Sequence, residues 1–122
     1  MKLTKAQQNL FFTEVKKWRD KVGLLRWSLS IGEGTQSDES DAECWGNLSS
    51  GTAVISIRDD WDEKPTDRYI TQLAFHEVIE LLLLPLSTLA ERRFCTADQL
   101  EIARHEIIRT LEHLLWKPEA PE

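Results

Sequence analysis

The stretch Leu73-Ala74-Phe75-His76-Glu77-Val78-Ile79-Glu80-Leu81-Leu82-Leu83-Leu84 places three ionisable side chains in the most apolar part of the chain. At about 100° per residue, the apolar residues in and before it cover one broad face of a helix, while His76, Glu77 and Glu80 fall together on a narrower arc. His76 and Glu80 are four residues apart, so their side chains lie about one turn apart on one face. The spacing therefore predicts a core helix that carries a polar site.

Burying an unpaired charge is costly, so these three groups must be paired, bound to a metal, neutralised by a pKa shift, or open to a cleft. One interpretation is a solvated or internally paired stripe, for example Glu80 bonded to Arg104 from a later helix. The other is a metal site. The sequence leaves both interpretations open at this point.

The length and composition are those of one globular domain. The chain has 122 residues, 41% of them hydrophobic and 30% charged, and we expect a single domain over residues 1–117 with a frayed tail over 118–122. The formal charge of −6 argues against a nonspecific nucleic-acid or membrane-surface binder, which needs a basic patch. The start shows no signal-peptide pattern, and the longest apolar run, 81–86, is shorter than the ~20 residues that span a bilayer. We therefore expect a soluble, cytoplasmic protein.

The patterns in the first half of the chain predict a helix followed by strands. A capping box at Thr4 and Gln7 and apolar residues at helical spacing predict a helix over about 4–22, ended by Gly23. Alternating apolar residues predict a strand over 25–31. Residues 44–48 and 52–57 flank a turn containing glycine, which predicts a hairpin. Three antiparallel strands are the simplest arrangement.

The second half reads as two helices. Thr66 or Asp67 can cap the helix that carries the polar site, and Pro85 is expected to stop it. A second capping box at Thr96 and Gln99 predicts a last helix to about residue 116. The predicted fold class is α+β: an N-terminal helix, a three-stranded antiparallel sheet, the motif helix and a C-terminal helix.

The last helix offers a third metal ligand. Its apolar stripe predicts that it packs on the sheet or on the motif helix, and His105 lies at the edge of that stripe, four residues after Glu101. With His76 and Glu80 it would form a set of two imidazoles and one carboxylate. Such a set suits catalytic zinc with an open position for water, and also iron or manganese. Glu77 would then be free to take a proton from that water as general base.

These residues resemble the zincin metallopeptidases, whose active helix carries His-Glu-x-x-His and whose third ligand comes from a later helix. In this chain Glu80 stands in place of the second histidine, and a carboxylate can also ligate zinc. More loosely, the chain resembles small phage and prophage proteins described as metallopeptidases. The resemblance implies a minimal zincin-like core, with residues 52–57 as the strand that binds an extended peptide by main-chain hydrogen bonds.

Two functions from different classes follow. The first is a metal-dependent, peptidase-like hydrolase, with His76, Glu80 and His105 as ligands and Glu77 as base, acting on a peptide or protein substrate. The second is a noncatalytic interaction or assembly protein on the same scaffold, with or without a structural metal. The sequence shows no Gly-rich nucleotide loop and no elbow for a serine or cysteine nucleophile.

Overall fold

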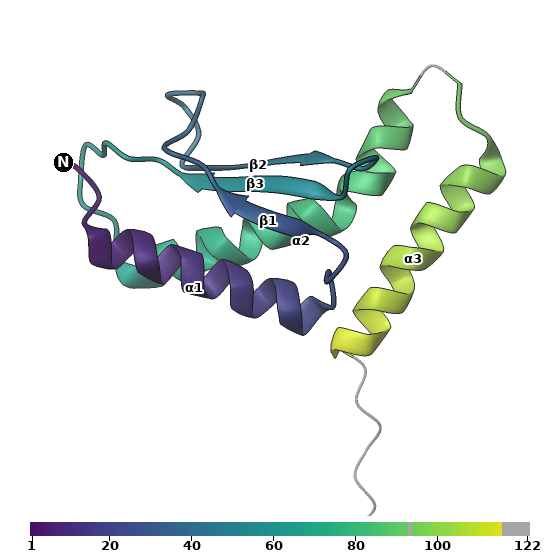
Figure 1. Cartoon of the computed structure of the whole chain (residues 1–122), viewed down its shortest axis with the longest axis horizontal. Helices are drawn as coiled ribbons and strands as arrows, with labels where there is room; N and C mark the ends of the chain where they lie inside the picture. Colours follow the sequence, from purple (N-terminus) through teal and green to yellow (C-terminus); the bar gives the residue numbers. More distant parts are fainter. Residues whose placement is uncertain (93, 116–122) are drawn as a thin grey trace, which may run out of the picture.

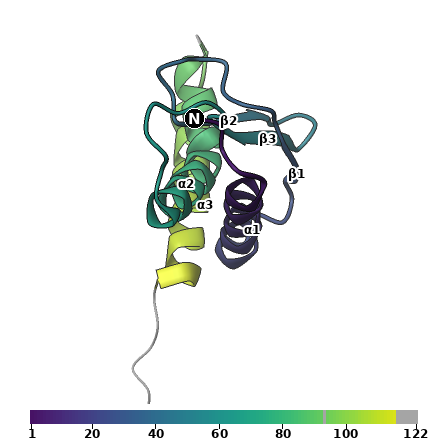
Figure 2. The same ribbon diagram turned by 90° about the vertical axis from the view of Figure 1, so that its left-hand side faces the viewer.

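The computed structural model describes residues 1–92 and 94–115. Within them the chain forms six elements in the order α1 (Lys5–Val22), β1 (Ser28–Ile31), β2 (Ala42–Asn47), β3 (Thr52–Ile57), α2 (Asp67–Glu91) and α3 (Ala97–Leu115). Helices α1 and α2 lie on one side of the sheet, and α3 packs beside them (Figures 1 and 2). The predicted α+β class is therefore confirmed. The end of the last helix and the tail lie outside the described residues.

The capping signals at the two ends of α1 and at the start of α3 are confirmed. The Thr4 hydroxyl accepts from the Gln7 amide and the Gln7 side chain accepts from the Thr4 amide, so the capping box begins α1. Gly23 ends the helix in the left-handed conformation at φ 88°, which glycine adopts without a Cβ penalty. Thr96 and Gln99 make the same reciprocal bonds at the start of α3.

The sheet is mixed, and the prediction of three antiparallel strands is wrong. Its order is β1-β3-β2, with β1 parallel to β3 and β2 antiparallel to β3. The predicted hairpin of β2 and β3 is present. However, residues 32–41 form too long a connection for a tight hairpin between β1 and β2. Strand β2 therefore does not pair with β1, and β3 lies between the two. Residues 52–57 are therefore the central strand, paired on both sides, and not an open edge.

Helix α2 continues past Pro85 to Glu91, contrary to the predicted stop. A proline inside a helix removes one main-chain hydrogen bond, but Leu84 and Leu86 on either side pack against the core and hold this turn. By length and composition alone, α2 is also the one described helix that could cross a membrane, with a mean hydropathy of 1.6. Core helices of soluble proteins pass the same test.

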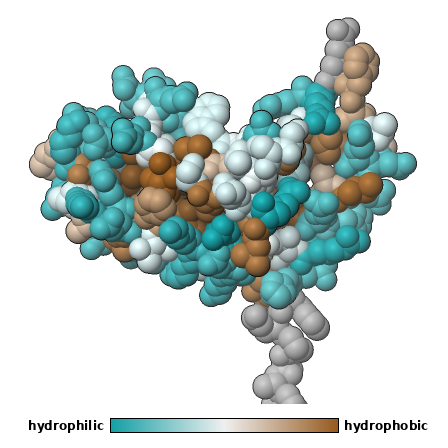
Figure 3. All heavy atoms as spheres, in the orientation of Figure 1, coloured by the Kyte–Doolittle hydropathy of each residue, from teal (hydrophilic) through white to brown (hydrophobic). Residues whose placement is uncertain are grey.

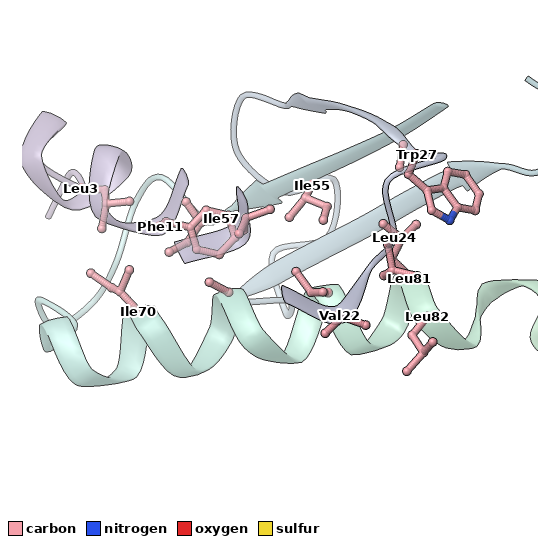
Figure 4. Packing of buried hydrophobic residues seen from close by; sticks show 14 of the residues in the cluster. Leu3, Phe11, Val22, Leu24, Trp27, Ile55, Ile57, Ile70, Leu81 and Leu82 are labelled. Atoms are coloured by element: carbon pink, nitrogen blue, oxygen red, sulfur yellow. The ribbon is translucent and has the colours of Figure 1, made fainter. Parts of the chain in front are cut away.

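The core lies between the sheet and helices α1 and α2 (Figure 4). It is one continuous cluster to which every element contributes, and its fully buried members include Phe11, Val15, Ile55, Ile70, Val78 and Leu81. Helix α3 adds Ala103 and Ile107 as its only described buried residues. None of the described helices covers the opposite face of the sheet, and Trp45 and Val54, paired across β2 and β3, are 53% and 38% exposed.

Candidate functional site

The site is built on the turn of α2 that faces strand β2. Six residues of α2 are buried, and five of them are apolar residues of the core: Ile70, Ala74, Val78, Leu81 and Leu82. The sixth is Glu77, whose side chain the same rotation of the helix turns toward the core's edge. Because the apolar residues fix how α2 sits against the sheet, the direction of Glu77 is fixed with them.

Glu77 is the least ordinary side chain of the described part of the molecule. The residue is 4% exposed, and its Oε2 atom is buried without a hydrogen-bond partner among the described residues. Buried carboxylate oxygens normally accept hydrogen bonds, since desolvation without a partner is costly. An unpartnered oxygen of this kind indicates a group that is protonated, or that meets a molecule from outside.

Burial raises the pKa of Glu77 from its ordinary 4.5 to about 7. Burial is the largest cause of this rise; the negative charge of Glu80 adds to it, His76 opposes it, and Glu43 adds a smaller part. The thiol of Cys44 is affected by the same carboxylates. Burial is the main cause that raises the pKa of Cys44 to about 12, and the charges of Glu77 and Glu80 add to it. Cys44 therefore stays a neutral thiol near neutral pH, as expected for a partly buried cysteine that is no nucleophile.

His76 and Glu80 lie beside Glu77 on the exposed side of the helix. The His76 Nε2 atom is 3.4 Å from Glu80 Oε1, and their side chains are 65% and 56% exposed. The sequence predicted that these three residues share one arc, and the structure brings them together. The three side chains differ in burial, however. The Glu77 side chain is buried, whereas those of His76 and Glu80 are exposed to solvent.

A shallow hollow of about 290 Å³ opens next to these residues, lined by Asp41, Ala42, Tyr69, Gln72, Leu73, His76 and Glu77. The Tyr69 hydroxyl donates to the Asp41 carboxylate across it. This hydrogen bond raises the pKa of Tyr69, so the phenol keeps its proton. The residues that line the hollow therefore include the buried carboxyl group of Glu77 and the hydrogen-bonded pair of Tyr69 and Asp41.

The sequence reasoning missed Tyr69 and Asp41. Tyr69 precedes His76 by seven residues, or about two turns, so it lies on the same face of α2. That spacing is a signal that could have found it. Asp41 is the last residue of the connection over 32–41 and meets Tyr69 of α2 only through the fold, so its position in the sequence carries no such signal.

The structure does not bring His105 to His76 and Glu80. His105 is two residues from Ala103 and from Ile107, the buried residues of α3, and so lies about 200° around the helix from both. Its Nδ1 atom is 2.9 Å from the main-chain oxygen of Glu101. Among the described residues, no three His, Cys, Asp or Glu side chains come together in a group that could hold a metal ion.

Arg104 does not reach the site either. It is exposed and lines a separate hollow with Leu86, Ala97, Leu100 and Glu101, between α3 and the end of α2. In the described part of the chain the ion-pair partner of Glu80 is His76. The interpretation in which Arg104 neutralises Glu80 is therefore not the arrangement found.

Comparisons with protein-family models, with curated proteins and with solved structures find no match for this chain.

Proposed function

We propose that this chain is a hydrolase in which Glu77 is the general base that takes a proton from an attacking water. The observation that carries the proposal is the buried, unpartnered Oε2 atom of Glu77 beside an open hollow. Glu77 is one of the residues that line the hollow, and a rotation of its carboxyl group would bring the buried Oε2 atom to a water in that hollow. A pKa of about 7 supports the role, because a general base works best when its pKa is near the working pH.

A peptide is the proposed substrate class. Strand β2 is an edge of the sheet, packs against α2, and contributes Ala42 to the rim of the hollow. An extended peptide that paired with this edge would pass the hollow and present its carbonyl groups near Glu77. Residues 52–57 are already paired on both sides, so the strand addition that we propose is at β2.

A metal ion at His76 and Glu80 is a second element of the proposal, and it needs one more ligand. Catalytic zinc sites use three protein ligands, and the described residues bring together only these two with donor atoms free toward solvent. The donor set with His105 does not fit, so no step is assigned to zinc, manganese or iron. Elemental analysis after zinc loading and dialysis, on the parent and on His76→Ala, tests this: stoichiometric zinc lost in the variant would establish the metal.

The test of the base is turnover of a fluorogenic peptide library as a function of pH. We expect activity to rise through about pH 7 as Glu77 ionises, and Glu77→Gln to abolish it. The matched variant is Glu101→Gln, which removes an exposed carboxylate from α3 and should keep both the activity and its pH dependence. Activity that survives Glu77→Gln would refute the role of Glu77, and an equal loss in Glu101→Gln would show that the effect is not specific to the buried carboxylate.

The noncatalytic interaction protein is the second candidate. One observation favours it: the ligand set of a catalytic metal is not assembled in the described residues. In that case Glu77 would still titrate near pH 7, because its burial does not depend on catalysis, but no peptide would be turned over. Carboxyl NMR of Glu77 together with the peptide screen separates the two candidates.

A further inference from the structure

Strand β1 leaves one edge of the sheet open. The Ser28 amide donates to the Gly51 oxygen at 2.8 Å, and the Gly32 amide to the Ile55 oxygen at 3.1 Å. Alternate residues of a strand point their main-chain groups the same way, so those of Leu29 and Ile31 point away from β3. In the end-on view β1 lies at the outer border of the sheet, with no described element beyond it (Figure 2).

The edge is four residues long, and shortness is one way in which proteins protect an exposed strand, but its sequence lacks the charged residues and proline that do so. Charged side chains and proline usually discourage pairing with another chain, and the run Ser28-Leu29-Ser30-Ile31-Gly32 contains neither. The other edge, β2, carries Glu43 and follows Asp41. Of the two edges, β1 is the one open to pairing with a copy of itself.

Apolar surface lies next to the open edge. A hollow of about 610 Å³ runs between α1 and the end of β1, and its apolar lining residues are Phe11, Phe12, Ile31 and Ile57. The space-filling view shows apolar side chains gathered where β1 faces α1 (Figure 3). A strand added to β1 would cover part of this surface, which favours association through the hydrophobic effect.

We propose that β1 pairs with β1 of a second copy of this chain, antiparallel, about a two-fold axis at Ser30. The main-chain groups fix the register. In an antiparallel pair, residues whose amides point outward must oppose each other as a hydrogen-bonded pair, so Leu29 faces Ile31 of the second copy and Ser30 faces Ser30. The two sheets join into one, and Leu29 and Ile31 of both copies form a continuous strip on the helix side.

The charges at the two ends of the paired strands are complementary in this register. Arg26 lies two residues before β1 and Glu33 two residues after it, and both are exposed. In this register Arg26 opposes Gly34 of the second copy and so lies one position from Glu33 of that copy, and the two-fold axis repeats the arrangement at the other end. A two-fold interface must be complementary to itself, and this edge meets that condition in main chain, apolar surface and charge.

Sedimentation equilibrium of the full chain tests the proposal. We expect the parent to show a mass of twice 14.1 kDa at high concentration and to dissociate on dilution. Ser30→Lys places two lysines face to face on the axis, which should raise the dimer dissociation constant by about fivefold or more. The matched control is Thr52→Lys, an exposed position on the same face of β3, which should dimerise like the parent.

Mixing gives the sharpest version of the experiment. Ser30→Lys and Ser30→Glu should each weaken the dimer, and an equimolar mixture should restore it as a heterodimer, seen by native mass spectrometry. Circular dichroism melts check that each variant is folded. A parent that stays at 14.1 kDa at every concentration would overturn the proposal, and so would equal weakening by Ser30→Lys and Thr52→Lys.

Discussion

Helices α2 and α3 each carry a histidine and a glutamate four residues apart, and the two pairs have different surroundings. His76 and Glu80 face each other across 3.4 Å beside the buried Glu77. His105 instead lies near the main-chain oxygen of Glu101 on the outer side of α3. The same residue types at the same spacing therefore produce a polar cluster in one helix and a surface contact in the other.

The cause of the difference is how firmly each helix is held. Helix α2 buries six residues between the sheet and α1, whereas α3 buries two in its described length. Deep burial fixes the rotation of α2 about its own axis and so forces Glu77 inward at the edge of the apolar face. Helix α3 packs along a narrower stripe, and its histidine stays outside that stripe.

The largest expected effect tests this contrast in packing directly. Leu81→Ala on α2 removes a side chain that is 0% exposed, and we expect it to lower the free energy of unfolding by about 3–4 kcal/mol. Ile107→Ala on α3 removes one that is 9% exposed and should cost about 2 kcal/mol. Urea unfolding of both variants checks the difference, and equal losses would show that α3 is held as firmly as α2.

The next effect is the pH dependence that Glu77 gives to stability. Its pKa in the folded protein is about 7 against an ordinary 4.5, so the folded state holds the proton more tightly than the unfolded state. The contribution of Glu77 to the free energy of unfolding is therefore fully present below about pH 4.5. It is lost as the pH rises to about 7, and the loss is up to about 3 kcal/mol. Glu77→Gln should not show this fall and should be more stable than the parent at pH 8.

Urea unfolding of parent and Glu77→Gln at pH 4 and pH 8 measures that difference. The control is Glu101→Gln, which removes an exposed carboxylate from α3 and should follow the parent at both pH values. Parallel pH curves for the parent and Glu77→Gln would mean that Glu77 titrates normally, and its assignment as a buried base would fail.

Much of the fold follows from short-range sequence signals. The capping boxes at Thr4 and Thr96 and the hairpin turn at Gly51 each depend on residues within a few positions, and the structure confirms them. The parallel pairing of β1 with β3 depends on which strand enters the gap beside β1. That choice is made by the long connection over 32–41 and by burial, and no local pattern records it.

The same division holds for the site. His76, Glu77 and Glu80 meet because they are neighbours on one helix, which the sequence predicts. His105 would have had to meet them through the packing of two helices, and that packing is set by Ala103 and Ile107. The angle between His105 and these two residues was available from the sequence. That angle argues against His105 as a third ligand beside His76 and Glu80.

A smaller effect concerns how closely α2 approaches the sheet. A Cβ atom added to Gly46 of β2 would lie 2.3 Å from Leu84 Cδ2, so the leucine would have to move. Because that atom is the end of a flexible side chain, we expect Gly46→Ala to cost about 1 kcal/mol. In a Leu84→Ala background the same change should cost less. A double-mutant cycle measures the coupling, and additive costs would contradict this contact.

The smallest effect on stability returns to the two glutamates. Glu80→Gln on α2 and Glu101→Gln on α3 each remove an exposed charge, so each should change the free energy of unfolding by less than about 0.5 kcal/mol. Only Glu80 acts on the buried base, because its charge raises the pKa of Glu77. Carboxyl NMR should therefore show a lower Glu77 pKa in Glu80→Gln and an unchanged one in Glu101→Gln. An equal pKa in both variants would mean that the charge of Glu80 does not act on Glu77, and that Glu80 is as independent of it as Glu101 on α3.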